Sequence, residues 1–199
     1  MQKELLYDNV FDAQEHYRLL LDCMARPGEV RTLTAPVVHP PVGIHASAAL
    51  VGFALLNADA SFYAAGPGGE AVASYLRENT DGVPRDVSEA DFIFMAGETA
   101  EAAALIDRVR VGTLPYPEGG ATIVLSVASL EKGELTLLLS GPGVATENAL
   151  YISGLHIDIL EAVQQQNEEF PLGIDLILAD PQGKIAAIPR SSRVRWGGA

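Results

Sequence analysis

The sequence predicts an α/β protein built on a mixed β-sheet with helices on its faces. Strand-like and helix-like segments alternate between residues 45 and 109, which favours a partly parallel sheet. Further along, two apolar segments, Gly173–Ala179 and Lys184–Pro189, flank the turn sequence Asp180-Pro181-Gln182-Gly183 and predict a β-hairpin. Both faces of this hairpin are apolar, so we expect it to be covered on both sides.

The first element is a helix expected over Asp12–Met24. Asp12 can cap its first turn and Glu15 follows three residues later, which is a capping-box pattern. Pro27-Gly28 ends the helix. Apolar residues at helical spacing predict a buried stripe formed by Ala13, Tyr17, Leu20, Leu21 and Met24.

The next segments carry the alternation of strands and helices. A nearly all-apolar helix rich in small residues is expected over His45–Asn57, and this composition places it deep in a core or in a subunit contact. The other predicted elements are a strand at Val30–Leu33, a loop from Pro36 to Gly43, a strand at Ser61–Ala65, a helix at Glu70–Glu78, a polar loop at Thr80–Ser88, a strand at Phe92–Met95 and a helix at Thr99–Val109.

The pattern changes after residue 111. Residues 112–120 predict a long loop, and Ala121–Val127 with Glu134–Ser140 predict a second hairpin around residues 131–133. A short strand is expected at Asn148–Ile152 and a helix at His156–Asn167. No repeat or linker interrupts the chain, so we expect one domain over residues 1–199.

Two registers are possible for the C-terminal hairpin. One pairs residue 180 with 184, places Asp175 opposite Pro189 and puts Arg190 on the other side of the hairpin, free for an anion or a partner. The other pairs 180 with 183 and makes Asp175 and Arg190 diagonal neighbours that can form an ion pair. Gly183 at the fourth turn position favours the first register, in which Asp175 needs another partner, such as backbone N–H groups or Arg26.

Composition limits the possible functions. The 199-residue chain has a net charge of −13, which opposes non-specific binding to nucleic acids or acidic membranes. No apolar run is long enough for a membrane span, and the acidic N-terminus lacks the apolar region of a secretory signal. A single cysteine, Cys23, fits a reducing compartment, so we expect a cytoplasmic protein of a prokaryote. After Asp180 no acidic residue follows, but four cations do: Lys184, Arg190, Arg193 and Arg195.

Catalytic motifs are weak. The segment Gly66–Gly69 between a strand and a helix could hold a phosphate on backbone amides, but it matches no full phosphate-binding motif, and an ordinary turn is the alternative. Cys23 is interpreted as a small buried hydrophobe. No metal or cofactor is expected, because neither the histidines nor the lysines stand in a suitable pattern or setting: His16, His39, His45 and His156, and Lys3, Lys132 and Lys184.

Asp175 and three arginines are the strongest candidates for a site. A charge in an apolar strand is costly unless it is paired, which singles out Asp175. Arg26, Arg190 and Arg193 can each make bidentate contacts with a carboxylate or a phosphate. We therefore name these four residues as candidates for binding an anion or a partner. Structural ion pairs are the alternative interpretation, and no catalytic residue is identified.

Short segments spread over nearly the whole chain form a recognisable combination. They are Phe11-Asp12, Tyr17-Arg18, Met24–Gly28, Gly112-Thr113, Pro117–Thr122, Gly141–Gly143, Phe170–Asp175 and Ile188–Val194. This combination, in this order, resembles the PhnH family of the carbon–phosphorus lyase system of phosphonate metabolism. Ser192 departs from the threonine expected in that family but keeps the hydroxyl group.

The resemblance implies a three-layer α/β/α fold like that of the pyridoxal-phosphate-dependent transferases, without the cofactor. It also implies a bacterial cytoplasmic protein that forms a homodimer when alone and joins the G, I and J subunits in a core complex. Such complexes displace adenine from ATP by a phosphonate and give a ribose 1-phosphonate 5-triphosphate. With one cysteine, this chain cannot itself hold the iron–sulfur cluster used in a later radical step.

Three hypotheses follow for this chain. The first is an accessory subunit that supports the transfer of a phosphonate onto the ribose of ATP. The second is an enzyme in its own right, with an anion or nucleotide site around Arg190 and Arg26. The third is an assembly scaffold whose basic C-terminal end docks on an acidic partner surface.

Overall fold

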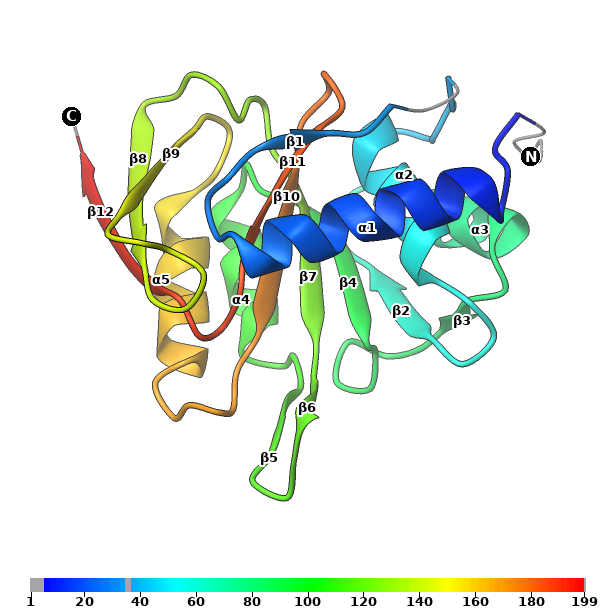
Figure 1. The fold of residues 1–199 in the computed structure, drawn as a ribbon. Coiled ribbons are helices and arrows are strands. Elements are labelled where there is room, and N and C mark those ends of the chain that lie inside the picture. Colours follow the sequence, from blue (N-terminus) through cyan, green and yellow to red (C-terminus); the bar gives the residue numbers. More distant parts are fainter. Residues whose placement is uncertain (1–5, 35–36, 199) are drawn as a thin grey trace.

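The computed structural model describes residues 6–34 and 37–198, which are organised around a seven-stranded mixed sheet (Figure 1). The strand order is β1-β11-β10-β7-β4-β2-β3. Strands β10, β7, β4, β2 and β3 are parallel, whereas β11 is antiparallel to both β10 and β1. The bounds are β1 Arg31–Thr32, β2 Ser61–Ala64, β3 Val83–Pro84, β4 Phe92–Ala96, β7 Thr122–Ser126, β10 Asp175–Ala179 and β11 Lys184–Ile188. The prediction of an α/β protein with a mixed sheet is confirmed.

Three helices cover one face of this sheet: α1 (Phe11–Ala25), α2 (Ala46–Leu55) and α3 (Gly69–Asn79). Every residue of α2 from Ser47 to Phe53 is buried, so the helix has no exposed side over that length. The predicted apolar helix at His45–Asn57 is therefore confirmed, together with its position deep in the core.

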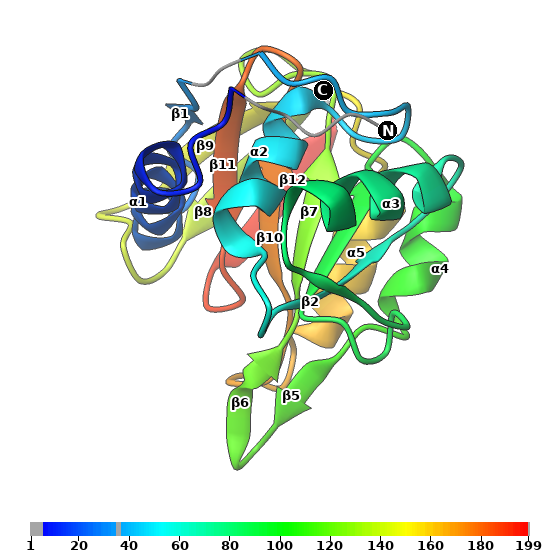
Figure 2. The same ribbon diagram turned by 90° about the vertical axis from the view of Figure 1, so that its right-hand side faces the viewer.

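The opposite face carries α5 (Ile157–Gln166), the short α4 (Ala103–Ile106) after a 3₁₀ turn, and a second sheet. Figure 2 shows α1 and α5 on opposite sides of the main sheet. The second sheet is antiparallel, in the order β12-β8-β9. Its strands are β8 Leu135–Ser140, β9 Asn148–Ile152 and β12 Arg193–Gly198. Its buried leucines pack in one core with Leu176 and Leu178 of β10.

A small hairpin, β5 (Val111–Thr113) and β6 (Tyr116–Gly120), projects from the body of the molecule at the bottom of Figure 1. The expectation of a loop over residues 112–120 is wrong: β5 and β6 pair with each other, although the glycines and Pro117 of this segment are typical of loops. Leu114 and Tyr116 at its tip are 75% and 68% exposed.

The hairpin of β10 and β11 has the favoured register. Leu176 pairs with Ile188, and Asp180 N–H donates to the Lys184 carbonyl at 2.9 Å. Gly183 takes the left-handed conformation that this turn requires (φ +85°). Ile177 packs on the side of α2, and Leu176 packs on the other side, in the core formed with α5 and the second sheet. Both sides of the hairpin are therefore covered, as predicted.

The second predicted hairpin is wrong. β7 lies between β4 and β10 in the main sheet, whereas β8 pairs with β9 and β12 in the other sheet. The Asp180 carboxylate holds the connection between β7 and β8 by accepting from Leu130 N–H at 3.1 Å. β12 and the short β3 were not predicted, and the helix expected over Thr99–Val109 shrinks to the 3₁₀ turn and α4.

The first helix also departs from prediction. Val10, not Asp12, is its N-cap residue, and the Asp8 carboxylate accepts from the N–H groups of Val10 and Phe11 just before and at the start of the helix. The helix begins at Phe11, so Asp12 lies inside its first turn. Its buried face contains His16, Leu20 and Cys23, whereas Tyr17 and Leu21 are 47% and 52% exposed. Pro36 and Lys3 lie outside the described residues.

Candidate functional site

Asp175 and Arg190 form an ion pair at the edge of the sheet where the parallel strands begin. Arg190 Nη2 lies 2.6 Å from Asp175 Oδ2, and Nε donates to both carboxylate oxygens at 3.2 and 3.1 Å. The backbone N–H of Arg190 also donates to Asp175 Oδ1 at 2.7 Å. The two side chains are 15% and 13% exposed, so the pair is largely shielded from water.

This pair contradicts the expectation that the favoured register leaves Arg190 free. Of the partners expected for Asp175, a backbone N–H group is confirmed, since the N–H of Arg190 donates to it, whereas Arg26 is not among its partners. The register is as predicted, but β11 ends at Ile188. Residues 189–192 then form a turn in which Ser192 N–H donates to the Pro189 carbonyl at 2.8 Å. The alternation of faces along a strand therefore does not extend to Arg190, whose side chain folds back onto Asp175.

Arg190 also ties the projecting hairpin to the sheet. Nη1 donates to the Pro117 carbonyl at 2.9 Å and Nη2 donates to the Gly120 carbonyl at 3.3 Å. A Cβ on Gly120 would lie 2.2 Å from Nη1 and 2.3 Å from the Gly173 carbonyl, so only glycine fits at position 120. Because Nε, Nη1 and Nη2 all have protein acceptors, the guanidinium fork is not free for bidentate binding of an anion.

Asn167, which sequence analysis missed, fixes the segment before β10. Its side chain accepts from Ile174 N–H at 2.6 Å and donates to the Ile174 carbonyl at 3.0 Å. A Cβ on Gly173 would lie 2.3 Å from Asn167 Oδ1, and Gly173 has a φ of +143°. Gly173 next to a buried strand was the available signal for such a close contact.

A cavity of about 820 Å³ opens beside the ion pair. Its lining contains four carboxylates, Asp59, Asp91, Glu118 and Asp175, and one guanidinium, Arg190. Since Asp175 already neutralises Arg190, the lining is net acidic and repels a free phosphate or phosphonate. This cavity suits a cationic or apolar group better than an anion.

Asp91 has its own network in the wall of this cavity. Its carboxylate accepts from the Ser61 N–H at 2.7 Å and from the Ser61 hydroxyl, and it pairs with Arg110. Partial burial by itself raises the pKa of Asp91. The hydrogen bonds from Ser61, followed by Arg110, outweigh that effect and hold the pKa below its ordinary value. Asp91 is therefore a charged, structurally engaged carboxylate.

The opposite edge of the sheet carries the glycine-rich turn. A smaller cavity of about 300 Å³ there is lined by Gly66, Pro67 and mostly apolar neighbours. A Cβ on Gly68 would lie 2.4 Å from the Val42 carbonyl, and one on Gly69 would lie 2.5 Å from the Ala64 carbonyl. Close packing within the protein thus explains these two glycines, and phosphate binding by this turn stays a prediction.

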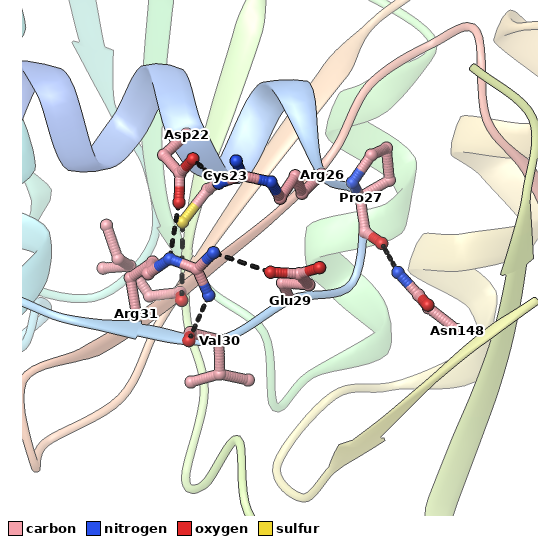
Figure 3. A network of polar contacts seen from close by, with 9 residues as sticks. Asp22, Cys23, Arg26, Pro27, Glu29, Val30, Arg31 and Asn148 are labelled. Carbon is pink, nitrogen blue, oxygen red and sulfur yellow. Dashed lines mark hydrogen bonds and ion pairs between the residues drawn. The ribbon is translucent and has the colours of Figure 1, made fainter. Parts of the chain in front are cut away.

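Arg26 lies in a different place, at the end of α1 (Figure 3). It pairs with Asp22, which also accepts from Arg31 Nε at 2.6 Å. Arg31 further donates to Glu29 at 2.6 Å and to the Val30 carbonyl at 3.1 Å. The network fixes the end of α1 and the chain that leads into β1, so it does not join Arg190 in one site.

The loop that follows Arg26 packs against the second sheet. Asn148 Nδ2 donates to the Pro27 carbonyl at 2.9 Å, as Figure 3 shows. A Cβ on Gly143 would lie 2.1 Å from the Ala25 carbonyl. The segments 24–28 and 141–143, which both contribute to the resemblance, therefore meet in a close backbone contact.

Arg193 is the remaining candidate. It is exposed at the start of β12 and has no side-chain partner within residues 6–34 and 37–198. Two residues on, Arg195 pairs with Glu147. Both arginines line a second cavity of about 710 Å³ between β12 and α5.

Comparison with known proteins decides the family. Residues 5–195 match the family of bacterial phosphonate metabolism proteins PhnH. The chain belongs to the PhnH family. It is 29% identical over 189 residues to a Rhizobium meliloti protein named alpha-D-ribose 1-methylphosphonate 5-triphosphate synthase subunit PhnH, covering 94% of this chain and 92% of that protein. It is 34% identical over 113 residues to HtxG of Stutzerimonas stutzeri, proposed to be a C–P lyase subunit, covering 57% of this chain and 55% of HtxG.

In this PhnH chain the cysteine and the two described lysines are buried, paired or exposed to solvent, and none of them is placed for catalysis. Cys23 is fully buried, its Sγ lies 3.8 Å from the Ile185 carbonyl, and burial raises the pKa of its thiol to about 11. Lys184 pairs with Glu131, and Lys132 is exposed. None of these groups has the geometry of an activated nucleophile.

The histidines of the PhnH chain are likewise dispersed. His16 is buried and contacts the Tyr7 hydroxyl and the Thr34 carbonyl, both at 3.3 Å. His45 and His156 are the N-cap residues of α2 and α5. Across the described part of the chain, no three His, Cys, Asp or Glu residues are grouped so as to hold a metal ion. None of the helices in that part is long and apolar enough to cross a membrane.

Proposed function

We propose that this chain is a subunit of the carbon–phosphorus lyase core complex. In that role it supports the transfer of a phosphonate onto the ribose of ATP with release of adenine. The observation that carries the proposal is the match to the PhnH family over residues 5–195. The full-length similarity to the Rhizobium meliloti synthase subunit supports it further.

An accessory role fits the geometry better than an independent enzyme does. The donors of Arg190 are engaged by protein acceptors, Arg26 belongs to a separate network, and the cavity next to Arg190 is acidic. A nucleotide carrying several phosphates would meet repulsion there rather than a receptive site. The proposed subunit therefore contributes to assembly or substrate handling, and the chemistry is carried out on its neighbours.

Finer features belong to the same proposal. The chain forms one domain with a fold related to the pyridoxal-phosphate-dependent transferases, without that cofactor, and acts in the cytoplasm. It forms a homodimer when alone and binds the G, I and J subunits in the complex. The exposed apolar residues Tyr17 and Leu21 of α1, with Val10 just before the helix, support self-association, because they would lose contact with water in a dimer.

The test is reconstitution. The other subunits are co-expressed with and without this chain, and adenine release from ATP is measured with methylphosphonate as the second substrate. We expect co-purification of the chain and adenine release only when it is present. Adenine release by the isolated chain would replace the accessory role by the hypothesis of an independent enzyme. Unchanged activity in its absence would contradict the proposal.

A further inference from the structure

β12 is an edge strand with one side unpaired. It comprises the six residues Arg193–Gly198 and hydrogen-bonds to β8 alone among the described strands. Its outer edge therefore presents backbone N–H and C=O groups that no strand in the described part of the chain pairs. Unpaired edges of this length are templates for the addition of another strand.

A cavity of about 710 Å³ borders β12. Successive side chains of a strand point to opposite faces, and β12 obeys this rule: Arg193 and Arg195 are exposed, whereas Val194 and Trp196 pack on the core. All four residues line the one cavity. Ser140 of β8 and Thr146 and Glu147 of the β8–β9 connection also line it, so the cavity borders β12 and reaches the adjoining end of β8. The far wall is α5, including Val163.

The two faces of this groove differ in chemistry. On the outer face, Arg193 has no partner among the described residues, whereas Arg195 pairs with Glu147. On the inner face, Val194 and Trp196 meet Leu160 and Val163 of α5 in an apolar wall. Ser192 also lines the cavity, and its hydroxyl is buried and lacks a hydrogen-bond partner in the described structure. A buried hydroxyl without a partner is costly, so a ligand that supplies one is favoured.

We propose that a partner protein adds an extended strand to the free edge of β12, with acidic side chains facing Arg193 and apolar side chains facing Trp196. This inference rests on the proposed function in that the partner is another subunit of the same complex. The backbone ladder provides affinity, and the alternation of acidic and apolar positions provides specificity.

A second copy of this chain is a poor occupant of the groove. Two β12 strands paired antiparallel would place Arg193 and Arg195 of one copy on the same face as those of the other. Like charges that are close across a strand pair are destabilising. Glu147, which pairs with Arg195, and Glu168 also line the cavity, so the charge complementarity that favours an acidic residue from a different chain is local to Arg193.

The single tryptophan of the chain is a direct reporter, because Trp196 lines the groove. The probe is a capped peptide of alternating glutamate and valine, matched in length to the six residues of β12. We expect a saturable change in Trp196 emission and slower hydrogen exchange of the amides in residues 193–198. A lysine–valine peptide should give neither.

The variant Arg193→Glu reverses the charge at an exposed position, so the chain should still fold. We expect it to lose about tenfold in affinity for the glutamate peptide and to bind the lysine peptide instead. The matched control, Arg108→Glu, changes the net charge equally at a residue that is 58% exposed and far along the sequence from β12. Equal binding of both peptides to the wild-type chain, an unaffected Arg193→Glu variant, or the same emission change with inorganic phosphate alone would overturn the proposal.

Co-purification with the other subunits tests strand addition at β12 separately from the proposed function as a subunit of the complex. If the wild-type chain and Arg108→Glu assemble but Arg193→Glu does not, the groove is the docking site. If all three assemble equally, the inference fails and the proposed function stands. If the wild-type chain does not assemble, the proposed function fails, and the peptide titration still decides whether β12 accepts an acidic strand.

Discussion

Arg190→Ala should destabilise the fold rather than silence a binding site. The change removes the ion pair with Asp175 and the hydrogen bonds to the carbonyls of Pro117 and Gly120. Among the described residues, only the backbone N–H of residue 190 then remains as a donor to the Asp175 carboxylate. Removing one partner of a buried pair costs roughly 3–5 kcal/mol, because the other charge stays behind without compensation.

The lower end of that range applies here. The two side chains are 13% and 15% exposed, so water can partly solvate the abandoned carboxylate. We therefore expect a loss of about 3 kcal/mol in the free energy of unfolding. For a domain of this size, that loss corresponds to a decrease in Tm of roughly 6–12 °C. Thermal and urea unfolding followed by circular dichroism measure both quantities.

Two controls make the result specific. Arg26→Ala removes an ion pair whose arginine is 52% exposed, and it should cost less than about 1 kcal/mol. In a chain that already carries Asp175→Asn, no charge is left unpaired when Arg190 is removed. Adding Arg190→Ala to that variant should therefore lower the free energy of unfolding much less than Arg190→Ala does in the wild-type chain. If Arg190→Ala unfolds like the wild-type protein but impairs adenine release in the reconstituted complex, the structural account is refuted and Arg190 acts in function.

Three further predictions test the core and its titratable groups. Ala49→Glu should unfold the chain or abolish its thermal transition, because Ala49 is fully buried and the new charge finds no partner; an unchanged Tm would contradict this. Cys23 should resist Ellman's reagent at pH 8 in the native protein and react in urea, because its pKa is raised to about 11 and it is buried; rapid native labelling would contradict this. Asp91→Asn should lower stability at neutral pH, and the difference from wild type should shrink as the pH falls below about 4. The sign follows from the depressed pKa of Asp91, since its contribution is present above the unfolded pKa and is lost on protonation in the folded state; a pH-independent difference would exclude this origin.

Local chemistry was sufficient to predict the β10–β11 hairpin. Asp180 and Gly183 determine the turn, and the turn determines the register of every pair from Ala179–Ile185 to Leu176–Ile188. The partner of Asp175 could not be predicted in the same way. Arg190 lies beyond the strand, in a turn whose direction depends on the carbonyls of a distant hairpin.

Non-local pairing caused the wrong prediction of a second hairpin. β7 and β8 are apolar and adjacent in sequence, which favours a hairpin, but β7 finds its neighbours in β4 and β10. Nothing in the local pattern distinguishes these outcomes, because both leave the same residues buried. In α1, two apolar stripes compete, and the one that contains His16 and Cys23 is the one that packs.

Five of the segments that carry the family resemblance meet in two structural junctions: 117–122, 170–175 and 188–194 in one, and 24–28 and 141–143 in the other. One is centred on Arg190, where the hairpin, Asp175 and the turn after β11 converge. The other joins the loop after α1 to the second sheet through Asn148 and Gly143. At both junctions a glycine is required because another backbone passes too close for a Cβ, as at Gly120 and Gly143. Arg190 is required because its donors bind acceptors of the protein itself. Packing and hydrogen bonding within the chain thus explain these residue types without a ligand. Residues that a fold must keep are poor markers of what it binds, whereas Arg193 has no structural partner in the described chain. For this reason the free edge of β12, which begins at Arg193 and Val194 within the segment Ile188–Val194, is where an interaction with another chain should be sought first.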